Sequence, residues 1–171
     1  MMRMILPLFV SLFLSLFACR KTSTLETPLP GAGDSTAGSY NVNKTLLLQL
    51  VNNVRSKGCN CGTTHMPAVA PLTWNDDLAK AAYAHSLDMS AHAYFSHTGN
   101  DGSDPSQRIE AAGYDWTTWG ENIANGYASE QAVVNGWLGS EGHCKNIMSA
   151  SFKDMGAGRS GNYWTQDFGA R

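Results

Sequence analysis

The sequence predicts an α+β fold, in which helices pack on a small, mainly antiparallel sheet. Apolar residues recur at helical spacing over 43–57 and 73–93. The last part of the chain predicts strands over 153–159 and 162–169, which flank the hairpin signal Ser160-Gly161. The chain has 171 residues, of which 43% are hydrophobic and 15% charged. This composition fits one domain with a buried core.

The N-terminus predicts an export signal. Arg3 precedes an apolar run over 5–17 that is too short to cross a membrane comfortably. The run ends in Leu16-Phe17-Ala18-Cys19, which resembles the lipobox of bacterial lipoproteins. That resemblance implies a signal peptide over residues 1–18 and a lipid on Cys19, which would anchor the protein to the membrane. The alternative is an ordinary signal peptide and a secreted protein.

The segment that follows predicts a tether. Residues 19–40 are rich in Thr, Ser, Pro and Gly and have no periodicity, which is typical of a flexible linker. The folded domain is then expected over 41–171. Arg20, rather than Asp, follows Cys19, so we expect sorting to the outer membrane of a bacterial envelope. The net charge of −2 and the pI of about 6.2 give no electrostatic footprint for nucleic acid.

Capping residues mark the expected helices. The first helix runs from the cap Asn43 to Gly58, and a loop over 59–71 follows. The second helix covers 73–93, with Asn75 as its cap. His85 and His92 share one face of it, but two turns separate them by ~10 Å, which favours hydrogen-bonded histidines over a metal pair. Further helices are expected from Asp104-Pro105 to Gly113, over 129–139 and over 140–148, and a strand over 118–124.

The cysteines predict a disulfide. Export implies an oxidising compartment, and with Cys19 lipidated three thiols remain. A bridge from the Cys59/Cys61 pair to Cys144 closes a long loop, which loop entropy favours by roughly 4 kcal/mol. Metal binding by Cys59-Asn60-Cys61 is the alternative.

Three glycine-flanked or turn segments carry the candidate site. They are Ser96-His97-Thr98-Gly99, Gly120-Glu121-Asn122 and Gly142-His143-Cys144. One carboxylate and two imidazoles on such loops are able to bind a metal or move a proton. The alternative is a structural hydrogen-bond network of Glu121 with His97 and His143. Cys144 beside His143 also resembles a nucleophile and base, unless Cys144 is bridged.

Seven motifs in order resemble the CAP superfamily, also called the SCP-like extracellular domain, and above all its bacterial secreted members. They are Asn53-x-Arg55, Pro71-Leu72-x-Trp74-Asn75-x-x-Leu78, Phe95-Ser96-His97-Thr98, Arg108-(x)4-Gly113-Tyr114, Gly120-Glu121-Asn122-Ile123-Ala124, Trp137-x-x-Ser140-x-Gly142-His143 and Tyr163-Trp164-Thr165-Gln166-x-Phe168-Gly169. The resemblance implies a three-layer α-β-α sandwich with a groove lined by the loops that bear His and Glu. It also implies that Cys61 is the partner of Cys144.

Only some of the groove residues of the family have a counterpart in this sequence. Animal and fungal members line the groove with two His and two Glu, and here one of each matches His97 and Glu121. The other Glu falls on Ser140 and the other His on Tyr163, whereas His143 is typical of bacterial members. We therefore expect a groove site of His97, Glu121 and His143, with Ser140 and Tyr163 beside it. The expected cofactor is Zn or another divalent cation on His97, His143 and Glu121.

Several functions fit these residues. The first is an envelope lipoprotein that binds a divalent metal or a lipid, sterol-like or peptide ligand in the groove. The aromatic residues Tyr114, Trp116 and Trp119 would serve such a ligand, or else pack in the core. A metal-dependent, protease-like hydrolase is an alternative, although the chain has no Gly-x-Ser-x-Gly motif. A protein–protein interaction module with a vestigial groove is another.

Overall fold

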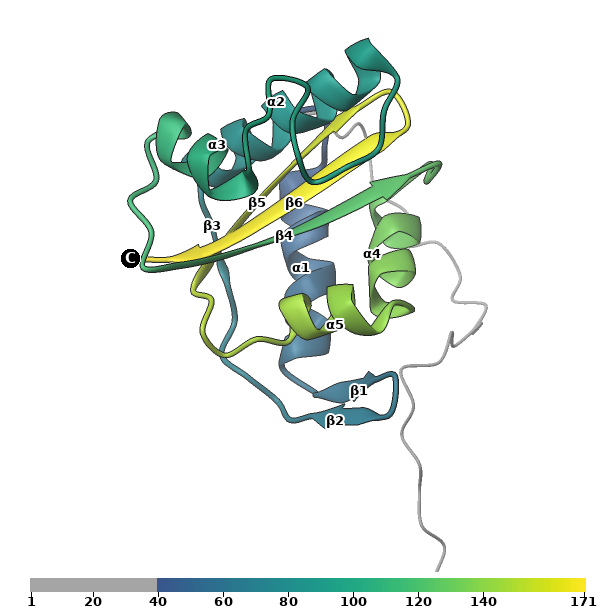
Figure 1. Ribbon diagram of the computed structural model, residues 1–171. Helices are drawn as coiled ribbons and strands as arrows, with labels where there is room; N and C mark the ends of the chain where they lie inside the picture. The colour runs from purple at the N-terminus through teal and green to yellow at the C-terminus, as the bar shows by residue number, and fades with distance from the viewer. Residues whose placement is uncertain (1–39) are drawn as a thin grey trace, which may run out of the picture.

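A computed structural model describes residues 40–171, so the expected signal peptide, Cys19 and most of the tether lie outside the described residues. The described chain forms three layers, with a four-stranded sheet between two groups of helices (Figure 1). Helices α2 (Asp76–His92) and α3 (Pro105–Ala112) cover one face. Helices α1 (Lys44–Arg55), α4 (Glu130–Leu138) and α5 (Glu141–Ile147) cover the other. The predicted α+β sandwich is confirmed.

The sheet has the strand order β3-β5-β6-β4. The strands are β3 (Thr73–Trp74), β4 (Thr118–Asn125), β5 (Asp154–Ser160) and β6 (Tyr163–Ala170). The pairs β5–β6 and β4–β6 are antiparallel, and only the short β3 pairs in parallel with β5. The order places β4 at the edge of the sheet, where residues from the loops of both layers can approach it.

Three local expectations need correction. The second helix begins at Asp76, because Thr73–Trp74 pairs with β5 and Asn75 accepts hydrogen bonds from the first turn. The segment predicted as a loop contains a short hairpin of β1 (Cys59–Cys61) and β2 (Thr64–Met66). The two-residue turn between β5 and β6 is Gly161-Asn162, one residue later than expected, and Gly161 supplies the positive φ of 57°.

The two faces of the sheet differ in their packing. The main apolar core lies on the side of α1, α4 and α5, and includes the fully buried side chains Leu47, Val51, Val133, Trp137, Trp164 and Phe168. On the other side, α2 packs directly on β5. A Cβ on Gly156 would lie 2.1 Å from the backbone nitrogen of Ala79, and one on Gly158 would lie 2.4 Å from the Cα of Tyr83. Only glycine permits so close an approach of helix and strand.

A disulfide joins Cys61 in β1 to Cys144 in α5, with the two Cα atoms 5.4 Å apart. This is the pairing that the resemblance implies. It fastens the β1–β2 hairpin to the layer of α1, α4 and α5, where both cysteines are buried. Within residues 40–171, no helix is both long enough and apolar enough to cross a membrane.

Candidate functional site

The centre of the candidate site is the pair His97 and Glu121. His97 lies in the loop between α2 and α3, and Glu121 lies in the edge strand β4. The Nδ1 atom of His97 is 2.7 Å from Oε1 of Glu121. The side chain of Glu121 is only 1% exposed, whereas that of His97 is 52% exposed. Because a carboxylate only accepts, Nδ1 donates this hydrogen bond, and Nε2 is the ring nitrogen left for another group.

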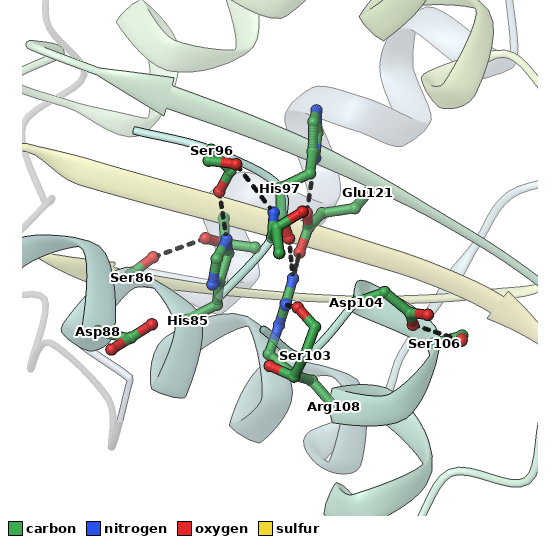
Figure 2. A network of polar contacts seen from close by, with 12 residues as sticks. His85, Ser86, Asp88, Ser96, His97, Ser103, Asp104, Ser106, Arg108 and Glu121 are labelled. Carbon is green, nitrogen blue, oxygen red and sulfur yellow. Dashed lines mark hydrogen bonds and ion pairs between the residues drawn. The ribbon is translucent and has the colours of Figure 1, made fainter. Parts of the chain in front are cut away.

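Arg108 in α3 binds the same carboxylate from its other side. Its Nη2 atom donates to Oε2 of Glu121 at 2.8 Å and to the backbone oxygen of His97 at 2.9 Å. Its Nη1 atom donates to the backbone oxygen of Ser103 at 2.9 Å. Figure 2 shows the side chain of Arg108 reaching the Glu121 carboxylate from the side of α3. The guanidinium therefore balances a buried charge and fixes the loop that carries His97.

Asp167 is a second buried carboxyl group at the site. It lies on β6 directly opposite Glu121 in the β4–β6 register, and its side chain is buried. Burial raises the pKa of Asp167 well above its ordinary value, and the charge of Glu121 and a hydrogen bond with it act in the same direction. Arg108 opposes this only in part. Burial and the neighbouring carboxylate of Glu121 therefore favour the protonated form of Asp167.

His85 in α2 completes a polar layer beneath the site. It is buried, and its Nε2 atom lies 2.8 Å from the backbone oxygen of Ser96. Burial lowers the pKa of His85, so the ring is neutral at pH 7. Within residues 40–171, four buried side-chain atoms have no hydrogen-bond partner, and three of them are His85 Nδ1, Arg108 Nε and Asp167 Oδ1. Such atoms are costly and are typical of functional sites rather than of optimised cores.

His143 approaches from the opposite layer. Its backbone oxygen in α5 accepts a hydrogen bond from Nδ2 of Asn122 at 3.2 Å, which ties α5 to β4 beside Glu121. Burial lowers the pKa of His143, and the nearby charge of His97 lowers it further. The two imidazoles are thus within electrostatic reach of each other, and His143 is a neutral base at pH 7.

Ser140 and Tyr163 occupy other positions. Ser140 lines a hollow of about 580 Å³ together with Tyr127 and Gly136 of the α4 side. Tyr163 pairs with Asn125 at the far end of β4, four residues along β6 from Asp167, which is roughly 13 Å at the rise of a strand. In the described chain, no hydrogen bond joins either residue to His97 or Glu121. The Glu121 side chain is bonded instead to His97 and Arg108, and Asp167 lies opposite it.

Sequence reasoning missed the roles of Arg108 and Asp167. Arg108 stands in one of the motifs, but nothing in the sequence shows which carboxylate it meets. Asp167 stands in the middle of a predicted strand on the face of Tyr163 and Thr165, and a buried acid there is a signal. Only the β4–β6 register, which is a tertiary property, places it opposite Glu121.

The expected divalent cation fits part of this donor set. Glu121 does not fit as a direct ligand, because His97 and Arg108 occupy both of its oxygens and the side chain is 1% exposed. It does fit as the carboxylate that holds a ligating histidine by its other nitrogen, which is the usual arrangement in metal sites. With Glu121 in that role, the imidazoles of His97 and His143 would be the groups left to hold a cation.

The structure also shows where the other residues singled out in the sequence lie. Cys144 is part of the disulfide, so it is not a nucleophile in this state. His92 lies at the surface with its Nδ1 2.8 Å from a carboxylate oxygen of Asp88. Of the aromatic residues, Tyr114 is fully buried, and Trp116 is 37% exposed and packs edge-on against Trp119.

The sequence matches a known family over most of its length. Residues 48–168 match CAP, the cysteine-rich secretory protein family. The chain therefore belongs to the CAP family, with the three-layer fold and the His97–Glu121 pair described above.

Two relatives come from Bacillus subtilis. The uncharacterized membrane protein YlbC is 35% identical over 122 residues, which cover 71% of this chain and 33% of YlbC. The uncharacterized protein YkwD is 40% identical over 100 residues, which cover 57% of this chain and 39% of YkwD. The chain thus spans between a third and two fifths of the length of these relatives.

Solved structures agree with this assignment. An extracellular SCP-domain protein of Bacillus anthracis superposes with a TM-score of 0.67 at 30% identity, over 74% of this chain and 40% of that chain. An outer surface protein of Borrelia burgdorferi superposes with a TM-score of 0.64 at 22% identity, over 75% of this chain and 92% of that chain. The second likeness concerns the fold alone.

Proposed function

We propose that this CAP domain is a ligand-binding module of the cell envelope, and that His97 and His143 hold a divalent cation such as Zn²⁺. The observation that carries the proposal is the 2.7 Å hydrogen bond from His97 Nδ1 to the buried Glu121. This bond fixes the tautomer and the orientation of a half-exposed ring, so its Nε2 faces a ligand without loss of rotamer freedom.

The charges around the site support the same proposal. The pKa of His143 is lowered, so its ring is available as a neutral donor at pH 7. The negative charge of Glu121 is already balanced by Arg108, so the ring nitrogens, rather than a carboxylate, would make the bonds to the cation. A cation bound there would supply Lewis-acid chemistry toward a polar ligand. His97 would hold and orient it, and Glu121 would keep the ring in place.

Calorimetric titration with Zn²⁺ tests the proposal. The wild-type domain is expected to bind about one ion per chain, and His97→Ala and His143→Ala are expected to weaken binding at least about tenfold. Glu121→Gln is expected to cost about 10–100-fold by releasing the ring, provided that circular dichroism shows an intact fold. His65→Ala is the matched control, because His65 is an exposed histidine on the β1–β2 hairpin. Absence of binding at micromolar Zn²⁺, or binding that His97→Ala leaves unchanged, contradicts the proposal.

We further propose that a lipid on Cys19 anchors the module in the outer membrane of a bacterial envelope. The lipobox-like Leu16-Phe17-Ala18-Cys19 and the linker composition of residues 19–40 support this placement. Such a tether would let the groove reach lipid, sterol-like or peptide ligands near the membrane. Mass spectrometry of the mature N-terminus tests it: acyl mass on Cys19 is expected, and an unmodified Cys19 or cleavage elsewhere contradicts it.

A further inference from the structure

The disulfide has a third sulfur beside it. Cys59 lies two residues before Cys61 on β1, so strand geometry directs both side chains to the same face. The Sγ atom of Cys59 is 3.7 Å from Sγ of Cys144, and the three sulfurs lie within 4.8 Å of one another. All three residues are buried. Two cysteines of one strand therefore face a single cysteine of α5.

We propose that Cys59, Cys61 and Cys144 form a thiol–disulfide exchange site, in which Cys144 bonds to Cys61 or to Cys59. In the step, the thiolate of Cys59 attacks Sγ of Cys144, a Cys59–Cys144 bond forms, and the Cys61–Cys144 bond breaks. Cys61 leaves as a thiolate and takes up the proton that Cys59 released. Atoms and electrons balance within the chain, so the exchange needs no external oxidant or reductant.

The distances place the reacting sulfurs near one another. Sγ of Cys59 must approach Sγ of Cys144 by about 1.7 Å to reach bonding distance. Because the three sulfurs form a compact triangle, Cys59 must also move toward the line of the Cys61–Cys144 bond. The β1–β2 hairpin has three residues in each strand and is the smaller of the two sheets, so it can adjust locally.

Exchange would change where the thiol is. Cys59 is 6% exposed and Cys61 is 0% exposed. In the observed state the thiol is therefore on Cys59, which is slightly exposed. After exchange the thiol would be on Cys61, which is fully buried. Reactivity of cysteine depends on access to the thiolate, so the two states differ in their response to oxidants and to incoming thiols.

Alkylation after an acid quench tests the proposal. Purified wild-type domain, at low concentration to suppress exchange between molecules, is equilibrated at mildly alkaline pH and then acidified to stop exchange. It is unfolded in denaturant, labelled with N-ethylmaleimide at mildly acidic pH and mapped by tandem mass spectrometry without reduction. Label on both Cys59 and Cys61 is expected, because in the unfolded chain the reagent reaches whichever thiol is present. Label confined to Cys59 overturns the proposal.

Two variants complete the test. Cys59→Ser is the matched control and should show no label on Cys61, because the attacking thiol is gone. Cys61→Ser should form an intramolecular Cys59–Cys144 disulfide and contain no titratable thiol in 40–171. Two titratable thiols in Cys61→Ser would show that Cys59 cannot bridge to Cys144 and would also overturn the proposal. Neither variant touches His97, Glu121 or His143, so the result is independent of metal binding.

Discussion

The two faces of the sheet are built on different principles. The face toward α1, α4 and α5 buries large apolar side chains and carries the disulfide. The face toward α2 and α3 has a small apolar cluster of Leu78, Ala81, Ile109 and Tyr114. Beside that cluster it buries the charged and polar groups Glu121, Asp167 and His85, against which Arg108 packs with a side chain that is 12% exposed.

This difference separates stability from function. Apolar burial and a covalent link stabilise one face without specific partners. On the other face, each buried charge depends on a named neighbour, and three buried polar atoms lack one within the described chain. Buried ion pairs add little net stability, but removal of one member is costly. The polar face therefore has the features of a functional site, and the apolar face supplies the stability that holds this site in place.

The largest expected effect is the loss of Arg108. Arg108→Met should lower the free energy of unfolding by about 3–5 kcal/mol, because Glu121 then remains buried opposite Asp167 without its cation. Arg171→Gln is the control, because its ion pair with Asp77 joins side chains that are 53% and 43% exposed, and its loss should cost under about 1 kcal/mol. Urea unfolding measures both. Equal effects of the two substitutions would remove the distinction between a buried and an exposed ion pair.

The next largest effect is expected where α2 packs closely on β5. Gly158→Ala should destabilise the domain by about 1–3 kcal/mol or more, because the added Cβ meets backbone atoms of Tyr83 that cannot move alone. Gly142→Ala in α5 is the matched control, since a Cβ there meets nothing within 4 Å. It should be neutral or slightly stabilising, as alanine favours a helix. Thermal unfolding of the two variants checks this, and a tolerated Gly158→Ala would show that the layers are looser than described.

The raised pKa of Asp167 predicts how the stability of the domain changes with pH. Its pKa in the folded state is raised above the ordinary 3.8, so the folded state keeps a proton that the unfolded state loses as the pH rises. The stability that this group contributes is full below that value and is lost as the pH rises toward the raised pKa. Asp167→Asn removes the titration, so its stability relative to wild type should grow from pH 4 to pH 7, by up to ~1.4 kcal/mol per pH unit.

Unfolding curves across that pH range measure the effect. Asp115→Asn, at an exposed loop position, is the control and should run parallel to wild type. A constant difference between Asp167→Asn and wild type would mean that Asp167 is not protonated opposite Glu121.

The smallest expected effect is a change in the pKa of His143 when His97, which lies in the opposite layer, is replaced. His97→Ala should raise the pKa of His143, because the charge of His97 is one of the causes that lower it. Burial is the larger cause and persists in the variant, so only part of the shift should be relieved. NMR titration of the imidazole protons measures it. An unchanged pKa of His143 would place the two histidines too far apart to share a ligand.

The sequence predicted what depends on local chemistry. Asn43, Asn75 and Asp104 cap their helices as expected, because each side chain bonds to amides two or three residues away. The motifs also pointed to His97 and Glu121, which the fold joins. The roles of Arg108 and Asp167 could not be predicted from the sequence. They arise from the α3–β4 contact and the β4–β6 register, which connect residues 13 and 46 positions apart. For the same reason the short β3 was assigned to the helix, although it pairs with distant β5.

Glu121 is proposed to hold His97 in one tautomer, with Nε2 directed to a ligand. A long-range ¹H–¹⁵N NMR spectrum of the histidine rings, recorded with and without Zn²⁺, observes this tautomer. We expect the His97 ring to carry its proton on Nδ1, and Zn²⁺ to shift its Nε2 resonance in wild type but only weakly in Glu121→Gln. A His97 ring with its proton on Nε2 alone, or a His97 spectrum that Zn²⁺ leaves unchanged, would show that Glu121 does not prepare His97 for a cation.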